Sequence, residues 1–496
     1  MPYDSQNRPV IGIDLGTTFS SISFWTGQGV QTYSPRGNNV FQSVVYFDER
    51  SKEFIYDTVA FNSGIFEPSN VCIGVKRLMD NKDIKIKFGD RQFSPIDISA
   101  MILKYMYKSV QDMFPEGVYN ASGVVVTVPY YFKANQLENT SQAAKKAGLN
   151  LVGIIQEPIA AALAYGCIHS SDNIKREETI LVFDLGGGTF DLTIFRVKED
   201  SENLIFEVLG IGGDDRLGGM DFDRALLKHI IQAEGIDFQS ESNERLRKRG
   251  KQALMAEAIK AKETLSFTDN AYMAVLNVIP GVNVDRNFTR DEFQEIMEGY
   301  YERIRNIVKS TLNRANVTPE DINKVIKVGG SSKIPMFDSL LNDIVGKGKI
   351  YSDIDPSLCV SQGAAIYAAY LTGNLNTRKK ITIIPVTAHA LGVEDAKGKF
   401  VVLIHENRKT PARKTLTFYT DQDNCTDVDV QVYQGNHRIA KENAHIGTVH
   451  VSGLIPAPKR TLEINITFEV KENQIVIVTV EQKESKIKKT EVLKLY

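Results

Sequence analysis

Two segments of the chain share one pattern, and this internal repeat limits the possible folds more than any other feature. Residues 11–25 read IGIDLGTTFSSISFW, and residues 180–195 read ILVFDLGGGTFDLTIF. Each segment is an apolar strand, an aspartate, a turn rich in Gly and Thr, and a second apolar strand. Because the unit occurs twice and far apart in the chain, it predicts two similar half-domains that face a common cleft.

The two turns carry residue types that bind phosphate groups. Glycines let backbone N–H groups approach phosphate oxygens closely, and turn amides form a concave site for anions. The hydroxyl groups of Thr17, Thr18 and Thr189 add further donors. Asp14 and Asp184 end the first strand of each unit, where a carboxylate can hold hydrated Mg²⁺. Neither turn ends in Gly-Lys-Ser/Thr, so the sequence predicts a phosphate and magnesium site outside the P-loop class.

A third glycine turn follows a predicted strand. Residues 324–335 read KVIKVGGSSKIP, in which Gly329 and Gly330 would let the backbone approach a flat ring or a ribose. The alternative is a tight strand-to-helix turn without a ligand.

The pattern of apolar residues divides the chain. Up to about residue 375, buried-strand patterns such as VVVTVP alternate with helical ones, including a long amphipathic helix after Asp291. After residue 388, apolar and polar residues alternate, as is typical of antiparallel strands. We therefore expect an α/β domain at 1–376, a linker at 377–387 and an antiparallel β domain at 388–496. The linker holds the apolar run ITIIP, which is either a segment that docks on a domain or the first strand of the β domain.

Composition excludes several classes of protein. The 496 residues include 59 Lys and Arg and 61 Asp and Glu, a net charge of −2, which argues against a strongly basic nucleic-acid-binding protein. The 4 cysteines are too far apart in sequence for a zinc knuckle or a redox pair, which fits a reducing compartment. There is no secretory signal pattern, and no apolar run approaches the ~20 residues of a membrane helix. The sequence thus predicts a cytoplasmic protein with no nucleic-acid or membrane partner.

Taken together, the motifs resemble those of heat-shock protein 70 chaperones over essentially the whole chain. The resemblance rests on IGIDLGTTFS, GVKRL, VTVPYYF, GIIQEPIAAALAYG, FDLGGGTFDL, RLGGMDFD, VGGSSKIP and QGAA. It implies an α/β actin-like ATPase fold, with two lobes around a nucleotide site, followed by an antiparallel β-sandwich that binds extended peptides. It also implies ATP or ADP and Mg²⁺ as ligands.

The same resemblance implies a role for each matching residue. Lys76 would be the catalytic lysine, Glu157 would position the attacking water, and Thr189 would lie beside the γ-phosphate. Three aspartates would surround Mg²⁺ and water: Asp14, Asp184 and Asp191, the first two holding the metal largely through water. The other nucleotide-binding positions are Gly16, Thr17, Thr18, Phe19, Gly186, Gly187, Gly188, Gly218, Gly219, Lys262, Ser266, Gly329, Gly330, Ser331 and Lys333. The peptide-groove positions, for which ordinary sandwich core is the alternative, are Val393, Phe418, Val428 and Ile464.

Several departures from the family pattern bear on function. The sequence stops at Tyr496, where a helical lid follows in the family, so we expect a lidless β domain that binds peptide weakly and exchanges it fast. Pro385 replaces the usual aspartate of the linker, and Leu137 stands where an arginine is usual in the relay between the domains. The sequence leaves open whether the domains still communicate.

The sequence therefore predicts a chaperone that binds and slowly hydrolyses ATP with Mg²⁺ and binds unfolded or extended polypeptide segments. J-domain co-chaperones and nucleotide-exchange factors would be its partners, and the stress response its setting. The alternative is a regulatory partner, a co-chaperone or ribosome-associated relative, that binds ATP and hydrolyses it poorly. A sugar or metabolite kinase on the same fold is disfavoured by the β domain.

Overall fold

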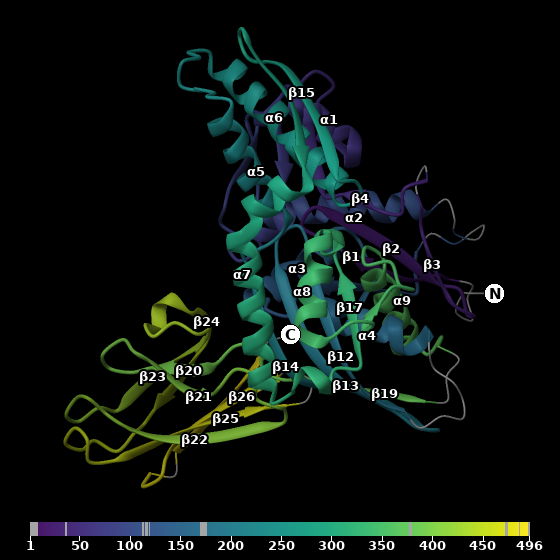
Figure 1. The fold of residues 1–496 in the computed structure, drawn as a ribbon. Helices are drawn as coiled ribbons and strands as arrows, with labels where there is room; N and C mark the ends of the chain where they lie inside the picture. The colour runs from purple at the N-terminus through teal and green to yellow at the C-terminus, as the bar shows by residue number, and fades with distance from the viewer. Residues whose placement is uncertain are drawn as a thin grey trace.

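The structure, a computed structural model, describes residues 8–34, 37–111, 114, 118, 120–168, 176–375, 379–471, 475–485 and 487–494. Two lobes, each with a central sheet, lie next to each other, and the yellow-green C-terminal strands form a β-sandwich at one end of them (Figure 1). An α/β part followed by an antiparallel β part is the order that the sequence predicts.

Lobe I is built on a sheet with the strand order β11-β10-β1-β2-β3, and β4 also pairs with β2. These strands are β1 (Val10–Asp14), β2 (Phe19–Trp25), β3 (Val30–Thr32), β4 (Phe41–Gln42), β10 (Gly123–Val128) and β11 (Leu151–Gln156). Every residue of β10 is buried, as its apolar run predicts for a strand covered on both faces. The other elements of this lobe are β5 (Val44–Asp48), β6 (Glu53–Tyr56), β7 (Val71–Ile73), β8 (Ile86–Phe88), β9 (Arg91–Phe93), α1 (Asp57–Phe66), α2 (Pro95–Gln111), α3 (Ala134–Lys146), η2 (Pro68–Asn70) and η3 (Val75–Leu78).

Lobe II is built on a sheet with the strand order β18-β17-β12-β13-β14-β19. These strands are β12 (Arg176–Leu185), β13 (Phe190–Glu199), β14 (Asn203–Asp214), β17 (Lys324–Val328), β18 (Ile350–Tyr351) and β19 (Lys380–Ile384). The further elements are β15 (Asn270–Ile279), β16 (Val282–Thr289), α4 (Glu157–Ile168), α5 (Gly219–Ala233), α6 (Glu244–Leu265), α7 (Arg290–Ala315), α8 (Pro335–Val345), η4 (Pro319–Asp321) and η5 (Gly330–Lys333). Helix α9 (Cys359–Leu371) follows them in the chain but packs on the sheet of lobe I. Within the described part of the chain, no helix has both the length and the apolar character needed to cross a bilayer.

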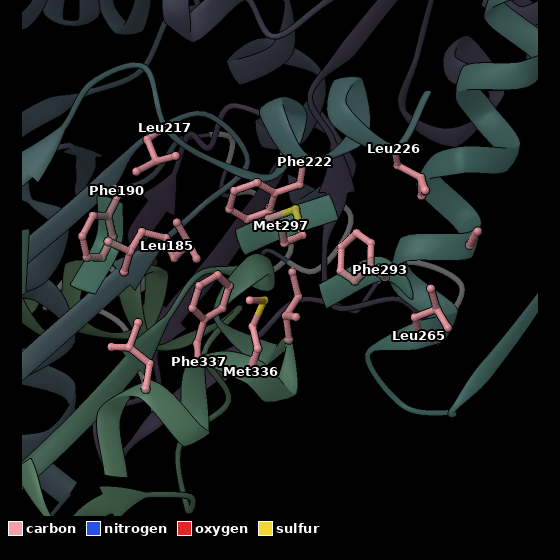
Figure 2. Close-up of a cluster of buried hydrophobic side chains, with 14 of the residues drawn as sticks. Leu185, Phe190, Leu217, Phe222, Leu226, Leu265, Phe293, Met297, Met336 and Phe337 are labelled. Atoms are coloured by element: carbon pink, nitrogen blue, oxygen red, sulfur yellow. The ribbon is translucent and has the colours of Figure 1, made fainter. Parts of the chain in front are cut away.

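The core of lobe II is rich in aromatic side chains. Phe190 of β13, Phe222 of α5 and Phe337 of α8 are fully buried in one cluster (Figure 2). The helix predicted after Asp291 is α7, and its buried residue Met297 joins this cluster. Full burial of one such side chain contributes about 1.5–3 kcal/mol. This packing gives the turn between β12 and β13 a rigid base.

Small residues let the two lobes approach each other closely. Helix α9 packs on β1, α4 packs on β12, and the two helices pack together. A Cβ atom at Gly363 of α9 would lie 1.7 Å from the carbonyl oxygen of Ala160 in α4, and one at Gly12 of β1 would lie 2.1 Å from the nitrogen of Ala365. The Ala- and Gly-rich runs QGAA and EPIAAALAYG therefore form the contact between the lobes.

The C-terminal strands form two antiparallel sheets with a shared core. Their orders are β21-β20-β23-β24 and β22-β25-β26-β27. The elements are β20 (Leu391–Glu394), β21 (Phe400–Ile404), β22 (Ala412–Tyr419), β23 (Asp427–Gln434), η6 (Ala440–Glu442), β24 (Ala444–Ser452), β25 (Glu463–Val470), β26 (Ile475–Gln482) and β27 (Ile487–Lys494). In β25 every second residue is buried, which confirms the alternation expected for these strands.

The apolar run of the predicted linker lies on lobe II. Strand β19 pairs in parallel with β14, with Ile381 opposite Leu204 and Ile384 opposite Glu207. Just before β19, the ammonium group of Lys379 lies 2.7 Å from a carboxylate oxygen of Glu199, and both side chains are buried. Of the two alternatives for this run, docking on a domain is the one observed.

Candidate functional site

The turns of the two repeated hairpins are in contact. The turn between β1 and β2 carries Thr17 and Thr18, and the turn between β12 and β13 carries glycines. A Cβ atom at Gly187 would lie 1.9 Å from Oγ1 of Thr18, and one at Gly188 would lie 2.5 Å from Oγ1 of Thr17. The half-domains predicted to face each other therefore do so, and only glycine fits at positions 187 and 188 of the second turn.

Three buried carboxyl groups lie beside these turns. Asp14 ends β1, and Asp184 of β12 is paired in register with Asp191 of β13. Burial, followed by the negative charge of Glu157, raises the pKa of Asp14 to about 7 and that of Asp191 to about 8. The same two causes raise the pKa of Asp184 well above its usual value. The ionised form of each group is therefore unfavourable until a cation is bound.

Several polar atoms here fit a hydrated metal ion. Among the described residues, Oδ2 of Asp184, Oδ2 of Asp191 and Oγ1 of Thr18 are buried without a hydrogen-bond partner. No group of three His, Cys, Asp or Glu side chains in the described ranges is placed to ligate a metal directly. Mg²⁺ usually keeps several of its waters and uses one or two carboxylates. The residues present thus fit Mg²⁺ held through water.

A buried ion pair lies next to these carboxyl groups. Nζ of Lys76, in η3, is 2.5 Å from Oε1 of Glu157, the first residue of α4, and both side chains are less than 10% exposed. Burial lowers the pKa of Lys76, but the charges of Glu157 and Asp14 outweigh burial, so the pKa is raised overall. Lys76 thus stays positively charged among the carboxylates.

The turn before α5 brings several predicted residues together. A Cβ atom at Gly218 would lie 2.7 Å from the nitrogen of Gly188, and one at Gly219 would lie 2.5 Å from Oγ of Ser331 and 3.3 Å from Nζ of Lys262. Lys262 also lies 2.7 Å from a carboxylate oxygen of Asp223. The predicted phosphate and adenosine positions therefore adjoin in space although they come from distant segments.

The third glycine turn fits closely against the second hairpin. Gly329 has a φ of +80°, a backbone conformation that favours glycine. A Cβ atom on it would lie 2.5 Å from the carbonyl oxygen of Leu185, whereas one at Gly330 would have no neighbour within 4 Å. Close packing is thus enough to require glycine at position 329. At position 330 there is free space, which a ligand could occupy.

The remaining nucleotide positions have different surroundings. The hydroxyl of Ser266 donates to the carbonyl of Lys262, and Lys333 pairs with Asp355 at 3.0 Å. In the first two turns, the amide of Gly186 donates to the carbonyl of Thr189 at 3.1 Å. A Cβ atom at Gly16 would lie 1.8 Å from the carbonyl oxygen of Phe19, whose side chain is exposed.

The sequence did not point to two further residues at the site. Arg77 donates to the carbonyl oxygen of Gly188 and pairs with Asp221 at 2.5 Å, so it links the two lobes. Thr127 of β10 donates from its hydroxyl to Oδ1 of Asp14 at 3.0 Å. A signal for Thr127 existed, because it is the one hydroxyl-bearing residue in the apolar run VVVTV. For Arg77 the signal was its place directly after Lys76 in GVKRL.

The predicted peptide-groove residues lie in the β-sandwich. Val393 and Ile464 are buried in its core, at 1% and 3% exposure. Phe418 and Val428 pack against the same core and are only partly buried. Phe418 of β22 is directly opposite Ile464 of β25.

Comparison with known protein families gives a match that covers nearly the whole chain. The family model described as Hsp70 protein matches residues 10–495. The match includes both lobes, the docked strand β19 and the β-sandwich.

Proposed function

The chain belongs to the Hsp70 family, and on this basis we propose that it binds ATP with Mg²⁺ where its two hairpin turns meet and hydrolyses the nucleotide slowly. Members of this family are generally ATPases and ATP-binding chaperones. The observation that carries the proposal is one buried carboxylate oxygen on each of Asp184 and Asp191 that has no hydrogen-bond partner in the described part of the chain, next to the buried pair of Lys76 and Glu157. We assign this activity to residues 1–376, followed by a linker at 377–387 and a peptide-binding domain at 388–496.

The turns would bind the phosphate groups. Thr17 and Thr18 offer hydroxyl donors from lobe I, and the glycine turn at 186–188 offers the backbone amides of Gly187 and Gly188 from lobe II, since the amide of Gly186 already donates to Thr189. Asp14 and Asp184 would hold Mg²⁺ through water, and the bound ion supplies positive charge that neutralises the phosphates. Lys262 and Ser331, which adjoin Gly219, would lie on the adenosine side.

Hydrolysis needs positioning and charge stabilisation more than covalent chemistry. The charge of Lys76 would stabilise negative charge on the transferred phosphoryl group. Its ion pair with Glu157 holds both side chains together, and the Glu157 carboxylate would orient the attacking water.

We further propose that the β-sandwich binds extended apolar polypeptide segments weakly and releases them fast. An extended peptide would add strand-like hydrogen bonds and place side chains in an apolar pocket. Of the four predicted groove residues, Val393 and Ile464 are buried in the core of the sandwich. Phe418 and Val428 are partly exposed, so these two would contact the peptide. J-domain co-chaperones and nucleotide-exchange factors are the proposed partners.

The test is to change Lys76→Ala in the full chain. Single-turnover hydrolysis should fall by about 10²–10⁴-fold, because a positioned charge in the transition state is lost. The affinity for ATP with Mg²⁺, measured by calorimetry, should change little. Lys104→Ala, which removes an exposed lysine of α2 in the same lobe, is the matched control and should hydrolyse ATP at the wild-type rate.

Other outcomes decide between the alternatives. Wild-type turnover in Lys76→Ala would overturn the assignment of the catalytic lysine. Binding of ATP by the wild-type chain without measurable turnover, even with a J-domain protein added, would support the regulatory partner instead.

A further inference from the structure

The carbonyl oxygens of the second hairpin turn are held from behind by hydrogen bonds. The backbone amide of Gly219 donates to the carbonyl of Gly186 at 3.0 Å, and the amide of Met220 donates to the carbonyl of Gly187 at 2.8 Å. Both donors lie in the first turn of α5, in the same lobe. The third carbonyl of the turn, that of Gly188, has no backbone donor in the described part of the chain.

The donor to this third carbonyl comes from the other lobe. Arg77, in η3 of lobe I, donates to the carbonyl oxygen of Gly188 from Nε at 2.9 Å and from Nη2 at 2.6 Å. The same guanidinium group pairs with the carboxylate of Asp221 in α5, whose Oδ2 also accepts from the amide of Gly218 at 2.9 Å. The side chains of Arg77 and Asp221 are each 16% exposed. Arg77 is thus fixed between the glycine turn and the helix behind it.

Holding these three carbonyl groups also sets the direction of three amides. In a trans peptide unit, the C=O and N–H groups point in opposite directions. Because the carbonyls of residues 186–188 bind α5 and Arg77, the amides of residues 187–189 point away from both. Among the described residues, none of these amides has a hydrogen-bond partner. Successive free amides of a turn form a site for an anion.

The charge of Arg77 distinguishes one of these amides from the other two. The carbonyls of Gly186 and Gly187 accept from neutral amides, whereas the carbonyl of Gly188 accepts from a cation. Hydrogen bonds in a chain polarise one another, so a strong bond at the C=O end of a peptide unit strengthens donation from its N–H end. The amide of Thr189, which shares its peptide unit with that carbonyl, is therefore the strongest donor of the three.

We propose that Arg77 is a positioning residue for the phosphate site. By holding the carbonyl of Gly188, it orients and polarises the Thr189 amide, which then donates to a phosphate oxygen. Its guanidinium group is occupied by protein acceptors, so it acts through this amide and not by touching the ligand. The inference rests on the proposed function, because it takes the ligand of the turn to be the phosphates of ATP.

The experiment compares two changes at position 77 with one control, all in the full chain. Arg77→Met removes the charge and the donors but keeps a long side chain. Arg77→Lys keeps the charge and a single donor, without the fork that reaches two acceptors at once. Arg224→Met is the matched control. Arg224 pairs with the same Asp221 at 3.2 Å, but it is 57% exposed and has no contact with the glycine turn among the described residues.

The first readout is steady-state hydrolysis of ATP with Mg²⁺. Arg77→Met should lower kcat by about 10- to 100-fold, because an oriented donor to the charge that develops on the phosphoryl oxygens is loosened. Arg77→Lys should recover part of this loss, and Arg224→Met should behave as wild type. A wild-type kcat in Arg77→Met, or losses of equal size in Arg77→Met and either of the other two variants, would overturn the proposal.

The second readout observes the Thr189 amide directly, which separates its orientation from any displacement of the neighbouring Lys76. The nucleotide-free chain is labelled with ¹³C-carbonyl glycine and ¹⁵N threonine, which limits the NMR spectrum to the three Gly-Thr pairs of the sequence. Inorganic phosphate is the probe. Phosphate should shift the Thr189 signal in wild type and in Arg224→Met. In Arg77→Met its dissociation constant should be about 10-fold higher, since a charge-assisted bond no longer supports the donor.

This readout also distinguishes failure of the inference from failure of the proposed function. If the wild-type chain hydrolyses no ATP, but phosphate shifts the Thr189 signal and binds more weakly to Arg77→Met, then Arg77 holds the amide and the proposed hydrolysis is wrong. If phosphate does not shift the Thr189 signal of wild type, or binds equally to both chains, the inference about Arg77 is wrong whatever the activity.

Discussion

The two hairpins share one plan but contribute different groups to the site. The turn of lobe I carries the side chains of Thr17 and Thr18, while the turn of lobe II carries glycines that leave room for them. Asp14 in lobe I receives a hydrogen bond from Thr127, whereas Asp184 and Asp191 in lobe II each keep a buried oxygen without a partner among the described residues. The two similar units are thus complementary: one supplies side-chain donors, and the other supplies space and buried acidic groups.

The largest effect should come from filling the space in the second turn. In Gly187→Ala the new Cβ atom would lie 1.9 Å from Oγ1 of Thr18, so one turn must move. A shift of about 1 Å in groups that bind phosphate can lower activity by about 100-fold, and we expect a loss of that size in affinity for ATP measured by calorimetry.

The neighbouring glycine provides the control for this change. A Cβ atom at Gly186 would meet its nearest atom, the carbonyl oxygen of Thr189, only at 3.8 Å, so Gly186→Ala should bind ATP nearly as wild type does. The double variant Thr18→Gly with Gly187→Ala should recover part of the loss. If Gly186→Ala loses as much affinity as Gly187→Ala, complementarity of the two turns is not the reason.

The next effect concerns the uncompensated charge in lobe II. Asp184→Asn should stabilise the nucleotide-free chain by about 1–3 kcal/mol. The change replaces a buried carboxyl group, whose charge is opposed by burial and by neighbouring carboxylates, with a neutral amide. Asp14→Asn should stabilise it less, since Asp14 also receives a hydrogen bond from Thr127, whereas the charge of Lys76 acts on both groups. Both should lose hydrolysis. Denaturant unfolding measures the free energy of unfolding of each variant. A larger increase in Asp14→Asn than in Asp184→Asn would contradict the prediction.

The raised pKa values also set how stability depends on pH. The pKa of Asp14 is about 7 and that of Asp191 about 8 in the folded chain, against 3.8 normally. Between these values the folded state binds more protons than the unfolded state, so the contribution of these groups to stability falls as pH rises from about 4 to 8. We expect the Tm of nucleotide-free wild type to fall relative to that of Asp191→Asn over this range.

Adding ADP with Mg²⁺ should reverse this trend, since a cation compensates the ionised carboxylates. The gain in Tm on adding the ligand should be larger at pH 8 than at pH 6. A gain independent of pH would show that these carboxyl groups do not face the metal.

The sequence predicted correctly those elements that form from the apolar pattern of one continuous segment. The hairpins at β1–β2 and β12–β13 follow from apolar runs around Gly and Thr turns, and α7 follows from its three- and four-residue spacing. Contacts between segments that are far apart in the sequence were not predictable in this way. Nothing next to Tyr130 or His389 in the sequence indicates that their side chains hydrogen-bond to Val386 and Tyr131, respectively.

The linker shows the same limit. Its apolar character predicted burial, but its partner is β14, and the pairing depends on which strand of lobe II has a free edge. Lys76 and Glu157 were assigned only by family resemblance, because 80 residues separate two groups that form one ion pair. The repeat therefore predicted the phosphate-binding turns, the resemblance added Lys76 and Glu157, and the structure shows the contacts between them.

The smallest effect compares a buried threonine in each lobe. Thr127→Val keeps the shape of the side chain but removes the donor to Asp14. That bond lowers the pKa of Asp14, so without it more of the group is protonated near pH 7. Loss of one such bond corresponds to about 1 kcal/mol, or about 5-fold weaker binding of ATP with Mg²⁺.

Lobe II provides the matched change, because Oγ1 of Thr193 in β13 is buried and has no hydrogen-bond partner among the described residues. Thr193→Val should leave affinity unchanged and leave stability equal or slightly higher, since no bond is lost and one unsatisfied polar group is removed. The 5-fold loss in Thr127→Val should also shrink by pH 9, where Asp14 is ionised in both chains. Equal losses in the two valine variants, or a loss that persists at pH 9, would mean that the hydroxyl of Thr127 acts on strand packing rather than on the charge of Asp14.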